Sequence, residues 1–410
     1  MELRPILSSL LRNKTGALLI AAQVALSLAI VANALYIIRD RLALTARPSG
    51  VAEENNVFRI SVGPLKAPET AEGKIANQQR NADVLRALPG VSSVAWTNQA
   101  PLGRSGWNMG LNLDPKQTES SANSSLYFGP DSLVKTYGLK IIEGRDFTAD
   151  DVQLIDPETT KGLGRYGMVS QALAKKLFPT GSAVGKTLYL GGASDPQPFQ
   201  IVGVVERLQS PWAQSSEVGE FSVILASRWA DTYSMYAVRT EPGQRDRVMK
   251  EAEAALLKAI PGQMVVNNKS LEEDRDDIYR DDRALAWMLI TVTVLLLLVT
   301  ASGIVGMATL WVNQRRKQIG VRRALGARRF DILRYFITEN LVITSGGIVA
   351  GLLLAVALNQ LLVSQLELTK LPIGYLAVGS LVLWLIGVLA VYGPAWRASS
   401  ISPAIATRSA

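Results

Sequence analysis

The pattern of hydrophobic and polar positions divides the chain into four long apolar runs and one long mixed stretch. The apolar runs contain no charged residue, and they cover Thr15–Ile38, Leu285–Val312, Leu341–Val363 and Pro372–Tyr392. About 20 residues of α-helix cross a hydrocarbon core of about 30 Å, so each run is long enough to span a bilayer. The chain between Arg39 and Arg283 contains no such run. We therefore predict that it forms a large domain outside the membrane.

Two stretches of this domain repeat the same order of strand, helix and strand. Alternating positions predict the strands, and helical spacing of apolar positions predicts the helices. Both helices run into an apolar residue followed by Pro and Gly, which ends them. Two such units favour a ferredoxin-like α/β sandwich, although two unrelated copies of a common unit are an alternative. The units cover Val57–Val62, Glu69–Leu88 and Val91–Thr97, and then Met235–Arg239, Gly243–Ile260 and Met264–Asn267.

The residues between these units, Ala100–Ser227, contain many Gly and Pro residues and short alternating segments. They predict a β-rich subdomain that is inserted into the sandwich, with one short helix at Gln171–Leu177. The expected strands are Gly138–Ile142, Tyr166–Val169, Thr187–Leu190, Phe199–Val205 and Phe221–Leu225.

The predicted fold class is an α-helical membrane protein with four transmembrane helices, one before and three after a large α+β domain. In that domain a ferredoxin-like sandwich carries the inserted β-rich subdomain. Before the large domain we expect a cytoplasmic amphipathic helix at 1–14, and the first span with a stalk at 15–46. In the domain, the two parts of the sandwich are 47–99 and 228–270, and the insertion is 100–227. After it we expect a second stalk and span two at 271–312, a cytoplasmic loop with a coupling helix at 313–340, spans three and four at 341–363 and 372–392, and a cytoplasmic tail at 393–410.

The charge of the chain is distributed unevenly about the predicted spans. Asp40–Asp282 contains 27 basic and 31 acidic residues, whereas the rest of the chain contains 16 basic and 4 acidic residues. An excess of Lys and Arg beside membrane spans indicates the cytoplasmic side. We therefore expect both termini in the cytoplasm and the large domain on the other side. The net charge of +8 reflects this topology, and no nucleic-acid partner is expected.

The absence of Cys and His limits the chemistry that the chain can perform. Disulfides, zinc sites built on Cys or His, and His-based catalytic triads are excluded, and no catalytic or metal-binding residue is predicted. The segment Gly181–Thr187 (GSAVGKT) resembles a phosphate-binding loop. It has three residues between its glycines where that loop needs four. It is predicted to be a turn, so no ATPase site is expected in this chain.

The most distinctive motif is a basic segment between the second and third apolar runs. Eight Lys or Arg residues lie among the 22 positions from Asn313 to Arg334, against one acid, Asp331. A membrane anchor would account for the charge but not for the small residues among it. We predict a short amphipathic helix that docks into a cytoplasmic partner through apolar contacts, close approach at small residues and Arg pairs. Its residues are Gln318, Ile319, Gly320, Val321, Arg322, Arg323, Ala324, Leu325, Gly326 and Ala327.

The spans themselves carry a packing motif and few polar residues. Gly347 and Gly351 lie one helical turn apart, a spacing that allows close packing of helices. Gln23, Asn33 and Asn359 are expected to form hydrogen bonds between helices. None of the apolar runs contains an ionisable residue, which an ion-coupled transporter usually needs. We interpret the spans as mechanical elements rather than as a conducting path.

Five short segments carry a resemblance to a known family. The most specific is QIGVRRALGA at Gln318–Ala327. The others are ALPGV, LFP…VGK, IVGVV and PAWRA, at Ala87–Val91, Leu177–Lys186, Ile201–Val205 and Pro394–Ala398. With these segments the chain resembles the permease subunits of MacB/FtsX-type ABC transporters, within the MacB-like group that has a periplasmic core domain. Gln314 and Gln318 stand where that family often has glutamates.

The resemblance implies that Gln318–Ala327 is the coupling helix for an ABC ATPase on a separate chain. That partner would bind ATP and Mg²⁺, and no cofactor is expected on this chain. A location in the bacterial inner membrane is also implied, with a porter-like sandwich in the periplasm and contact with membrane lipid. The expected assembly is a homodimer, or a heterodimer with a paralogous permease. In many members a periplasmic adaptor and an outer-membrane channel take part.

The function implied by the resemblance is mechanotransmission. ATP hydrolysis by the partner would move the periplasmic domain and drive efflux of a periplasmic substrate. Three alternatives are kept. The chain could be an FtsX-like regulator or signal relay, a LolC/E-like lipoprotein-release permease, or a membrane-tethered receptor without an ATPase.

Overall fold

The computed structural model describes residues 14–66, 70–160, 162–215, 218–366 and 371–400. They belong to two compact units. The helical unit contains the chain up to Leu44 and from Asp282 onward, and the α/β unit is Thr45–Asp281. The predicted amphipathic helix of residues 1–14, apart from Lys14, lies outside the described residues, as do residues 401–410 of the predicted tail.

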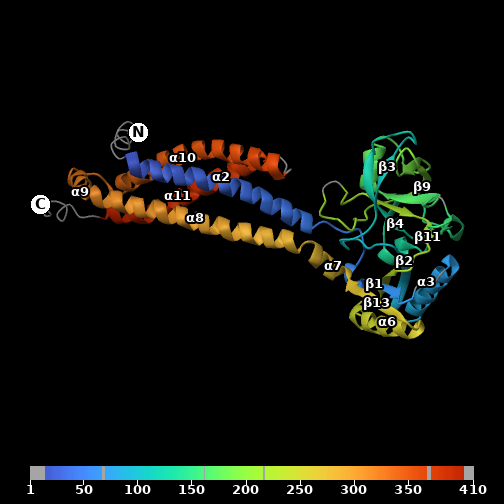
Figure 1. Ribbon diagram of the computed structural model, residues 1–410. Helices are drawn as coiled ribbons and strands as arrows, with labels where there is room; N and C mark the ends of the chain where they lie inside the picture. Colours follow the sequence, from blue (N-terminus) through green and yellow to red (C-terminus); the bar gives the residue numbers. More distant parts are fainter. Residues whose placement is uncertain (1–13, 67–69, 161, 216–217, 367–370, 401–410) are drawn as a thin grey trace. The chain divides into compact units, whose positions relative to one another are not determined.

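Among the described residues, four helices are long and apolar enough to cross a membrane, and each coincides with one predicted run. They run side by side (Figure 1) and are α2 (Lys14–Thr45), α8 (Arg280–Gln314), α10 (Arg329–Leu366) and α11 (Ile373–Ser399). Helix α10 begins well before its predicted run. Asp331 accepts a hydrogen bond from the Arg328 amide at 2.9 Å and so caps the helix. Ile332 and Phe336, one turn apart, are buried against the other helices.

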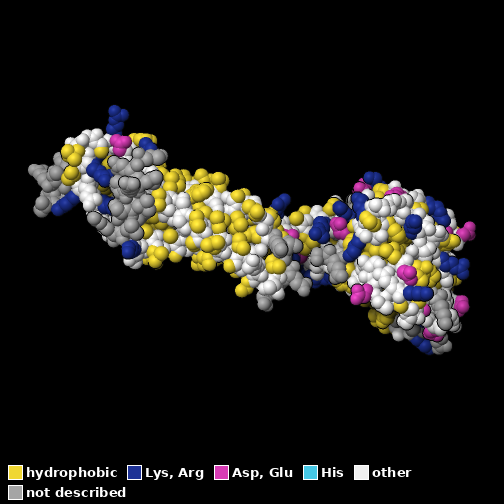
Figure 2. Space-filling view, turned by 90° about the horizontal axis from the view of Figure 1, so that it is seen from above, with side chains coloured by type: hydrophobic (Ala, Val, Ile, Leu, Met, Phe, Trp, Pro, Cys, Tyr) yellow, Lys and Arg dark blue, Asp and Glu magenta, His cyan; other side chains and the backbone are white. Residues whose placement is uncertain are grey.

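Gln23, Asn33 and Asn359 form hydrogen bonds between helices, as the sequence predicts. Gln23 donates to the Val299 carbonyl of α8 at 3.1 Å. Asn33 donates to the Ala355 carbonyl of α10 at 3.2 Å and accepts from Asn359 at 3.3 Å. Each amide therefore has a partner where no water is at hand. Figure 2 shows that hydrophobic side chains cover most of the length of this unit.

The first sheet of the α/β unit joins strands from both predicted β-α-β units. Its order is β13-β1-β12-β2, and every neighbouring pair is antiparallel. Helices α3 and α6 pack on it (Figure 1). Inward residues of the strands, such as Ile60 and Val238, are buried against Leu85 and Leu256 of the helices. The elements are β1 (Val57–Pro64), α3 (Ala71–Arg86), β2 (Val91–Thr97), β12 (Ser234–Thr240), α6 (Arg245–Ala259) and β13 (Gln263–Ser270).

The second sheet has the order β5-β9-β7-β10-β4-β3-β8, and β8 also pairs with β9. This second pairing closes the strands into a ring. Four predicted strands of the insertion are present as β7, β8, β9 and β10, whereas the predicted strand Gly138–Ile142 begins only at Ile141, because Gly138 ends a short helix in the left-handed region. The sequence analysis did not predict β3 and β4 of this sheet. The bounds are β3 (Asn108–Asn112), β4 (Ala122–Phe128), β5 (Ile141–Gly144), β7 (Tyr166–Ser170), β8 (Thr187–Leu190), β9 (Gln197–Val205) and β10 (Ser222–Leu225).

Shorter elements complete the chain. Gly181 and Gly185 adopt positive φ angles of 88° and 83° in a turn that leads into β8, as predicted for GSAVGKT. The predicted second stalk differs from expectation, because it is broken at Tyr279, whose φ and ψ are −99° and 10°. The remaining elements are η1 (Glu54–Asn56), α4 (Leu133–Tyr137), η2 (Ala149–Asp151), β6 (Gln153–Ile155), α5 (Gln171–Leu177), β11 (Ser227–Trp229), α7 (Leu271–Ile278) and α9 (Arg316–Ala324).

Candidate functional site

The predicted docking residues form the short helix α9 and the turn after it, at the end of the helical unit where α2 begins (Figure 1). A buried ion pair fixes where α9 starts. Arg315 donates to both carboxylate oxygens of Glu339 on α10, at 2.9 and 2.8 Å. Glu339 is only 1% exposed. Since breaking such a pair leaves a buried charge, it holds the end of α8 firmly against α10.

One side of α9 belongs to the core of the helical unit. Ile319 is 4% exposed and packs with apolar residues of α10 and α11, and Gly320 is also buried. The sequence analysis assigned Ile319 to the partner contact. In this structure Ile319 and Gly320 face the protein itself, so they seat the helix rather than form its free side.

The other side of α9 is free in the described chain and unusually apolar for a basic loop. Val321 is 51% exposed, and Leu325, just after the helix, is 83% exposed; Phe330, in the first turn of α10, is 67% exposed. Arg322 beside them is also exposed, as is Ala324. We call Val321, Arg322, Ala324, Leu325 and Phe330 the docking surface. A small apolar patch with a cation beside it is what a helix presents when it inserts into a groove of another protein.

The glycine after α9 sets the shape of the turn. Gly326 has φ of 99°. The Ala327 amide donates to the Arg322 carbonyl at 3.0 Å, and the Gly326 amide donates to the Arg323 carbonyl at 3.2 Å. This is a Schellman motif, which needs a residue in the left-handed region at that position. Gly326 therefore ends α9, and it leaves Leu325 projecting at the tip of the turn.

The two arginines of the motif have contacts within the chain. The Arg322 guanidinium lies 5.1 Å from the centre of the Tyr335 ring, a cation–π contact. Arg323 donates to the Ala327 carbonyl at 3.4 Å and is partly buried. Gln318 is exposed, and Ala327 is partly buried. Arg322 thus keeps a free, oriented charge at the docking surface, whereas Arg323 supports the turn.

Sequence reasoning missed three residues of this site. Glu339 and Arg315 stand just outside the charge-free runs, so neither was counted as part of a span. Phe330 looked like part of the basic connection. The available signal was the position of a single Glu at the start of a long apolar run, opposite an Arg at the end of another. Such a placement favours a pair across a helical hairpin.

The two glycines of α10 lie against α2. A Cβ atom on Gly347 would come within 2.7 Å of the Ala21 carbonyl oxygen, and one on Gly351 within 2.9 Å of the Ala25 carbonyl oxygen. Real Cβ atoms do not approach backbone so closely, so α2 and α10 pack at a distance that only glycine allows. The pair of glycines thus sets the spacing of these two helices.

An arginine of α7 joins the two ends of the α/β unit. Arg275 donates to both oxygens of Glu54 at 2.8 and 2.6 Å, and to the Arg47 and Thr45 carbonyls at 3.0 and 3.3 Å. We call Arg275, Glu54 and these two carbonyls the connector clamp. Chain enters the unit at Thr45 and leaves it through α7, so the clamp ties both connections to one point.

Further ion pairs hold the same connections in place. Arg59 of β1 contacts both oxygens of Asp274 at 2.5 and 2.8 Å, and both side chains are largely buried. In the helical unit, Arg41 of α2 pairs with Asp282 of α8 at 2.9 Å. Charge-assisted hydrogen bonds of this kind are stronger than neutral ones and fix the geometry of the groups that they join.

The carboxyl group of the connector clamp is held in its charged form. Burial acts to raise the pKa of Glu54, but hydrogen bonds from Arg275 and Ser49 outweigh it and lower the pKa below its ordinary value. Stabilisation from Glu54 is therefore present above the ordinary carboxyl pKa of about 4.3, and it is lost as the pH falls through the lower folded-state value.

Glu54→Gln is expected to destabilise the α/β unit by about 1 kcal/mol at pH 7, because Arg275 loses charge-assisted hydrogen bonds. The difference from the unchanged protein should shrink below about pH 4, where the native carboxyl also takes up a proton. Thermal unfolding of the full chain in detergent at both pH values measures this. The neighbouring exposed Glu53 is the control, since Glu53→Gln should change stability by less than about 0.5 kcal/mol. If Glu54→Gln lowered stability by the same amount at both pH values, Glu54 would not act as a charged carboxylate in the connector clamp.

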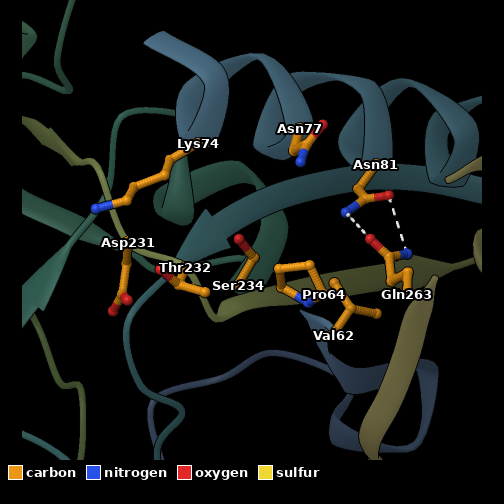
Figure 3. A pocket seen from close by; sticks show the side chains of 9 residues that line it. All are labelled: Val62, Pro64, Lys74, Asn77, Asn81, Asp231, Thr232, Ser234 and Gln263. Carbon is orange, nitrogen blue, oxygen red and sulfur yellow. Dashed lines mark hydrogen bonds between the residues drawn. The ribbon is translucent and has the colours of Figure 1, made fainter. Parts of the chain in front are cut away.

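A small polar pocket lies between α3 and the ends of the first sheet, and Figure 3 shows the side chains that line it. Asn81 donates to Gln263 at 2.9 Å and accepts from it at 3.2 Å, which ties α3 to β13. The cavity volume is about 10 Å³, room for about one water molecule, so it is too small for a substrate. Among the residues that the structure describes, no group of three or more acidic side chains could hold a metal ion.

Two family models match the chain. The model of the MacB-like periplasmic core domain matches residues 19–255. The model described as FtsX-like permease C-terminal matches residues 290–403. The first match covers the first span and most of the α/β unit, and the second covers the docking surface and the three later helices.

Individual relatives agree with these matches. The macrolide export ATP-binding/permease protein MacB of Chromobacterium violaceum is 26% identical over 66% of this chain and 41% of that protein. The uncharacterized ABC transporter permease YknZ of Bacillus subtilis is 27% identical over 68% of each. The periplasmic region of MacB from Actinobacillus actinomycetemcomitans, a crystal structure, is 15% identical over 58% of this chain and 97% of that chain, with a TM-score of 0.32. The chain spans between 36% and 52% of the length of the MacB relatives that it matches.

Proposed function

The chain belongs to the family of permeases with a MacB-like periplasmic core domain, and from this membership we propose that it is the membrane subunit of an ABC export system. An ATPase on a separate chain hydrolyses ATP with Mg²⁺. This chain binds that ATPase through the docking surface and converts the hydrolysis into movement of its periplasmic domain. The movement drives efflux of a substrate that is already in the periplasm.

The docking surface is the observation that carries the proposal. Val321, Leu325 and Phe330 expose apolar area on a connection that is otherwise basic. Leaving three large apolar side chains in water has a cost that contact with a partner removes. Arg322 beside them suits an acidic rim on that partner. The buried Ile319 then transmits a push on α9 into the core of the helical unit.

The topology in this proposal follows the charge of the chain. Lys and Arg residues crowd the connection between α8 and α10, which favours the cytoplasmic side of a bacterial inner membrane. One span precedes the periplasmic domain and three follow it, so both ends of the chain lie in the cytoplasm. The order β13-β1-β12-β2 supports assigning the first sheet to a ferredoxin-like sandwich.

The path of force uses the ion pairs described above. The Arg315–Glu339 pair joins the start of α9 to α10, and the Arg41–Asp282 pair joins α2 to α8. The connector clamp then passes the motion into the α/β unit through Arg275. Gln23 and Asn33 of α2 are used in bonds to α8 and α10, which supports a mechanical rather than a conducting role. The complete assembly would be a dimer of permeases with two ATPases. A periplasmic adaptor and an outer-membrane channel would carry the substrate onward.

The double variant Val321→Asp/Leu325→Asp tests the proposal. Two carboxylates on the docking surface should reduce the ABC ATPase that co-purifies with the chain by about tenfold or more, because they replace apolar contact with desolvated charge. Quantitative mass spectrometry of complexes extracted in mild detergent measures the ratio of the two subunits. Membrane insertion should be unchanged, since acidic residues contribute little to topology.

The matched control adds a carboxylate to an exposed side chain just before α9. Gln314→Asp should leave the amount of bound ATPase unchanged. Equal capture by the double variant and the unchanged protein would show that the docking surface is wrongly assigned. ATP hydrolysis by the purified chain alone would overturn the separate-ATPase proposal as a whole.

A further inference from the structure

A groove of about 790 Å³ opens on the helical unit, between the last turns of α2 and the first turns of α11. Its walls are mainly apolar and include Leu35, Ile38 and Leu42 of α2 and Val378 of α11. The volume lies within the range of about 300–1,000 Å³ that is typical of ligand sites. It is therefore large enough to hold more than a single side chain or a few waters.

Two polar side chains, Arg39 and Tyr375, stand in this apolar lining. Arg39 donates to the Tyr375 hydroxyl at 2.8 Å, and its guanidinium lies 6.0 Å from the centre of the same ring. The ring of Tyr36 meets that of Tyr375 edge to face at 5.4 Å. The two tyrosines thus hold the guanidinium at the groove in a defined orientation.

The charge of Arg39 is not cancelled by its neighbours in the helical unit. Its hydrogen-bond partner is the hydroxyl group of Tyr375 and not a carboxylate. Asp40 is exposed, and Arg39 forms no ion pair with any residue that the structure describes. Arg41, two positions on, differs in this respect, because it pairs with Asp282 at 2.9 Å. Arg39 is therefore available to an anion at the groove, and Arg41 is not.

The groove lies at the boundary of the apolar region. The charge-free run of α2 ends at Ile38, so Arg39 is the first charged residue beyond it. Tyrosines gather at the level of lipid headgroups, and Arg side chains at that level meet phosphates. An apolar groove that begins at this level and carries one free cation matches an amphiphile with an acyl chain and an anionic head.

We propose that this groove binds an anionic phospholipid, with an acyl chain along the α2–α11 surface and the phosphate on Arg39. A helix of a second copy is the other conceivable occupant. If the charge-free run of that helix filled the groove, it would bury the guanidinium without a counter-charge, which is costly. An anionic phospholipid fits both features of the groove, because its acyl chain covers the apolar walls and its phosphate pairs with Arg39. The site is separate from the docking surface and does not depend on the proposed ATPase.

The test uses the full chain in nanodiscs that contain equal amounts of phosphatidylglycerol and phosphatidylcholine with the same acyl chains. Native mass spectrometry after gentle delipidation counts the lipids that stay bound. The unchanged protein should retain about fivefold more phosphatidylglycerol than phosphatidylcholine, because the attraction between one Arg and an anionic headgroup corresponds to about this ratio. Arg39→Gln should abolish this preference, and Arg41→Gln should keep it.

A second variant tests the apolar part of the site. A Cβ on Gly374 meets open space, so Gly374→Leu fills the groove without disturbing the fold and should reduce retention of both lipids. Equal retention of the two lipids, or equal effects of Arg39→Gln and Arg41→Gln, would overturn the proposal. Since the chain contains no cysteine, Gly374→Cys reports directly on a protein occupant. Efficient disulfide dimers through that residue in nanodiscs would assign the groove to a second copy instead.

Discussion

Arg315→Met is expected to destabilise the helical unit by about 3–5 kcal/mol, because it leaves the Glu339 carboxylate buried without the guanidinium that it contacts. Glu339 is 1% exposed and lies on α10 at the level of Ile319 and Phe336, where water is scarce. Reversible unfolding in mixed micelles of mild detergent and sodium dodecyl sulfate measures the loss. Tryptophan fluorescence is a suitable signal, since Trp311 is buried in the same core.

The control for this prediction is a second substitution at the partner. In Arg315→Met/Glu339→Leu both charges are absent, and most of the lost stability should return, because apolar replacements of a buried pair are often neutral. Arg316→Met, at an exposed neighbouring position, should change stability by less than about 0.5 kcal/mol. A double variant that is as unstable as Arg315→Met would show that the pair itself does not determine stability.

Gly351→Leu is expected to cost about 3 kcal/mol or more, since overpacking against backbone is among the most destabilising changes in a tight interface. The new Cβ would lie 2.9 Å from the Ala25 carbonyl oxygen and 3.0 Å from the Ala25 Cα. Neither atom can rotate away, so α10 would have to separate from α2. The same unfolding assay measures the effect, and a lower yield of folded protein should accompany it.

Gly346 provides the matched control, because it belongs to the same helix and a Cβ there meets nothing within 4 Å. Gly346→Leu should be neutral or slightly stabilising, since Leu is a better helix former than Gly. If Gly346→Leu and Gly351→Leu have the same effect, the close approach of α2 and α10 does not exist in the membrane. Any general effect of a larger, more hydrophobic residue on insertion would appear in both variants.

The sequence predicted the elements whose pattern depends on one periodicity. The four apolar runs and the two β-α-β units were all identified, because each has either a uniform or an alternating distribution of side chains. Strand β4 was missed for a physical reason. Its sequence ANSSLYF combines small polar and large apolar residues that are nearly all buried on both faces, so it shows no alternation. Strand β3 (NMGLN) has Asn at both ends and Gly at its centre, so its composition resembles that of a loop.

Composition predicted a short helix at the site of α9, but not which of its sides faces the rest of the chain. Ile319 and Val321 are equally apolar in the sequence, and their roles differ only because α9 lies on the ends of α10 and α11, which bury the first and leave the second exposed. Helical periodicity over nine residues cannot determine which face meets the protein. Likewise the sequence places Glu339 opposite the basic residues after the second apolar run, but which of them pairs with it depends on how the two helices meet.

The discontinuous first sheet has a consequence for biosynthesis. Strand β1 pairs with β12 and β13, and β12 begins at Ser234, about 170 residues after β1 ends at Pro64. At about 5–20 residues per second, a ribosome needs roughly 10–40 s after β1 to supply both partners, since β13 ends at Ser270. During that interval β1 and β2 have been synthesised, but their backbone groups lack the hydrogen-bond partners of the finished sheet. The strands of the second sheet, in contrast, follow one another between β2 and β12 and pair among themselves. Secretion machinery or a chaperone that holds the early segment until β13 emerges would therefore determine how much of this protein matures.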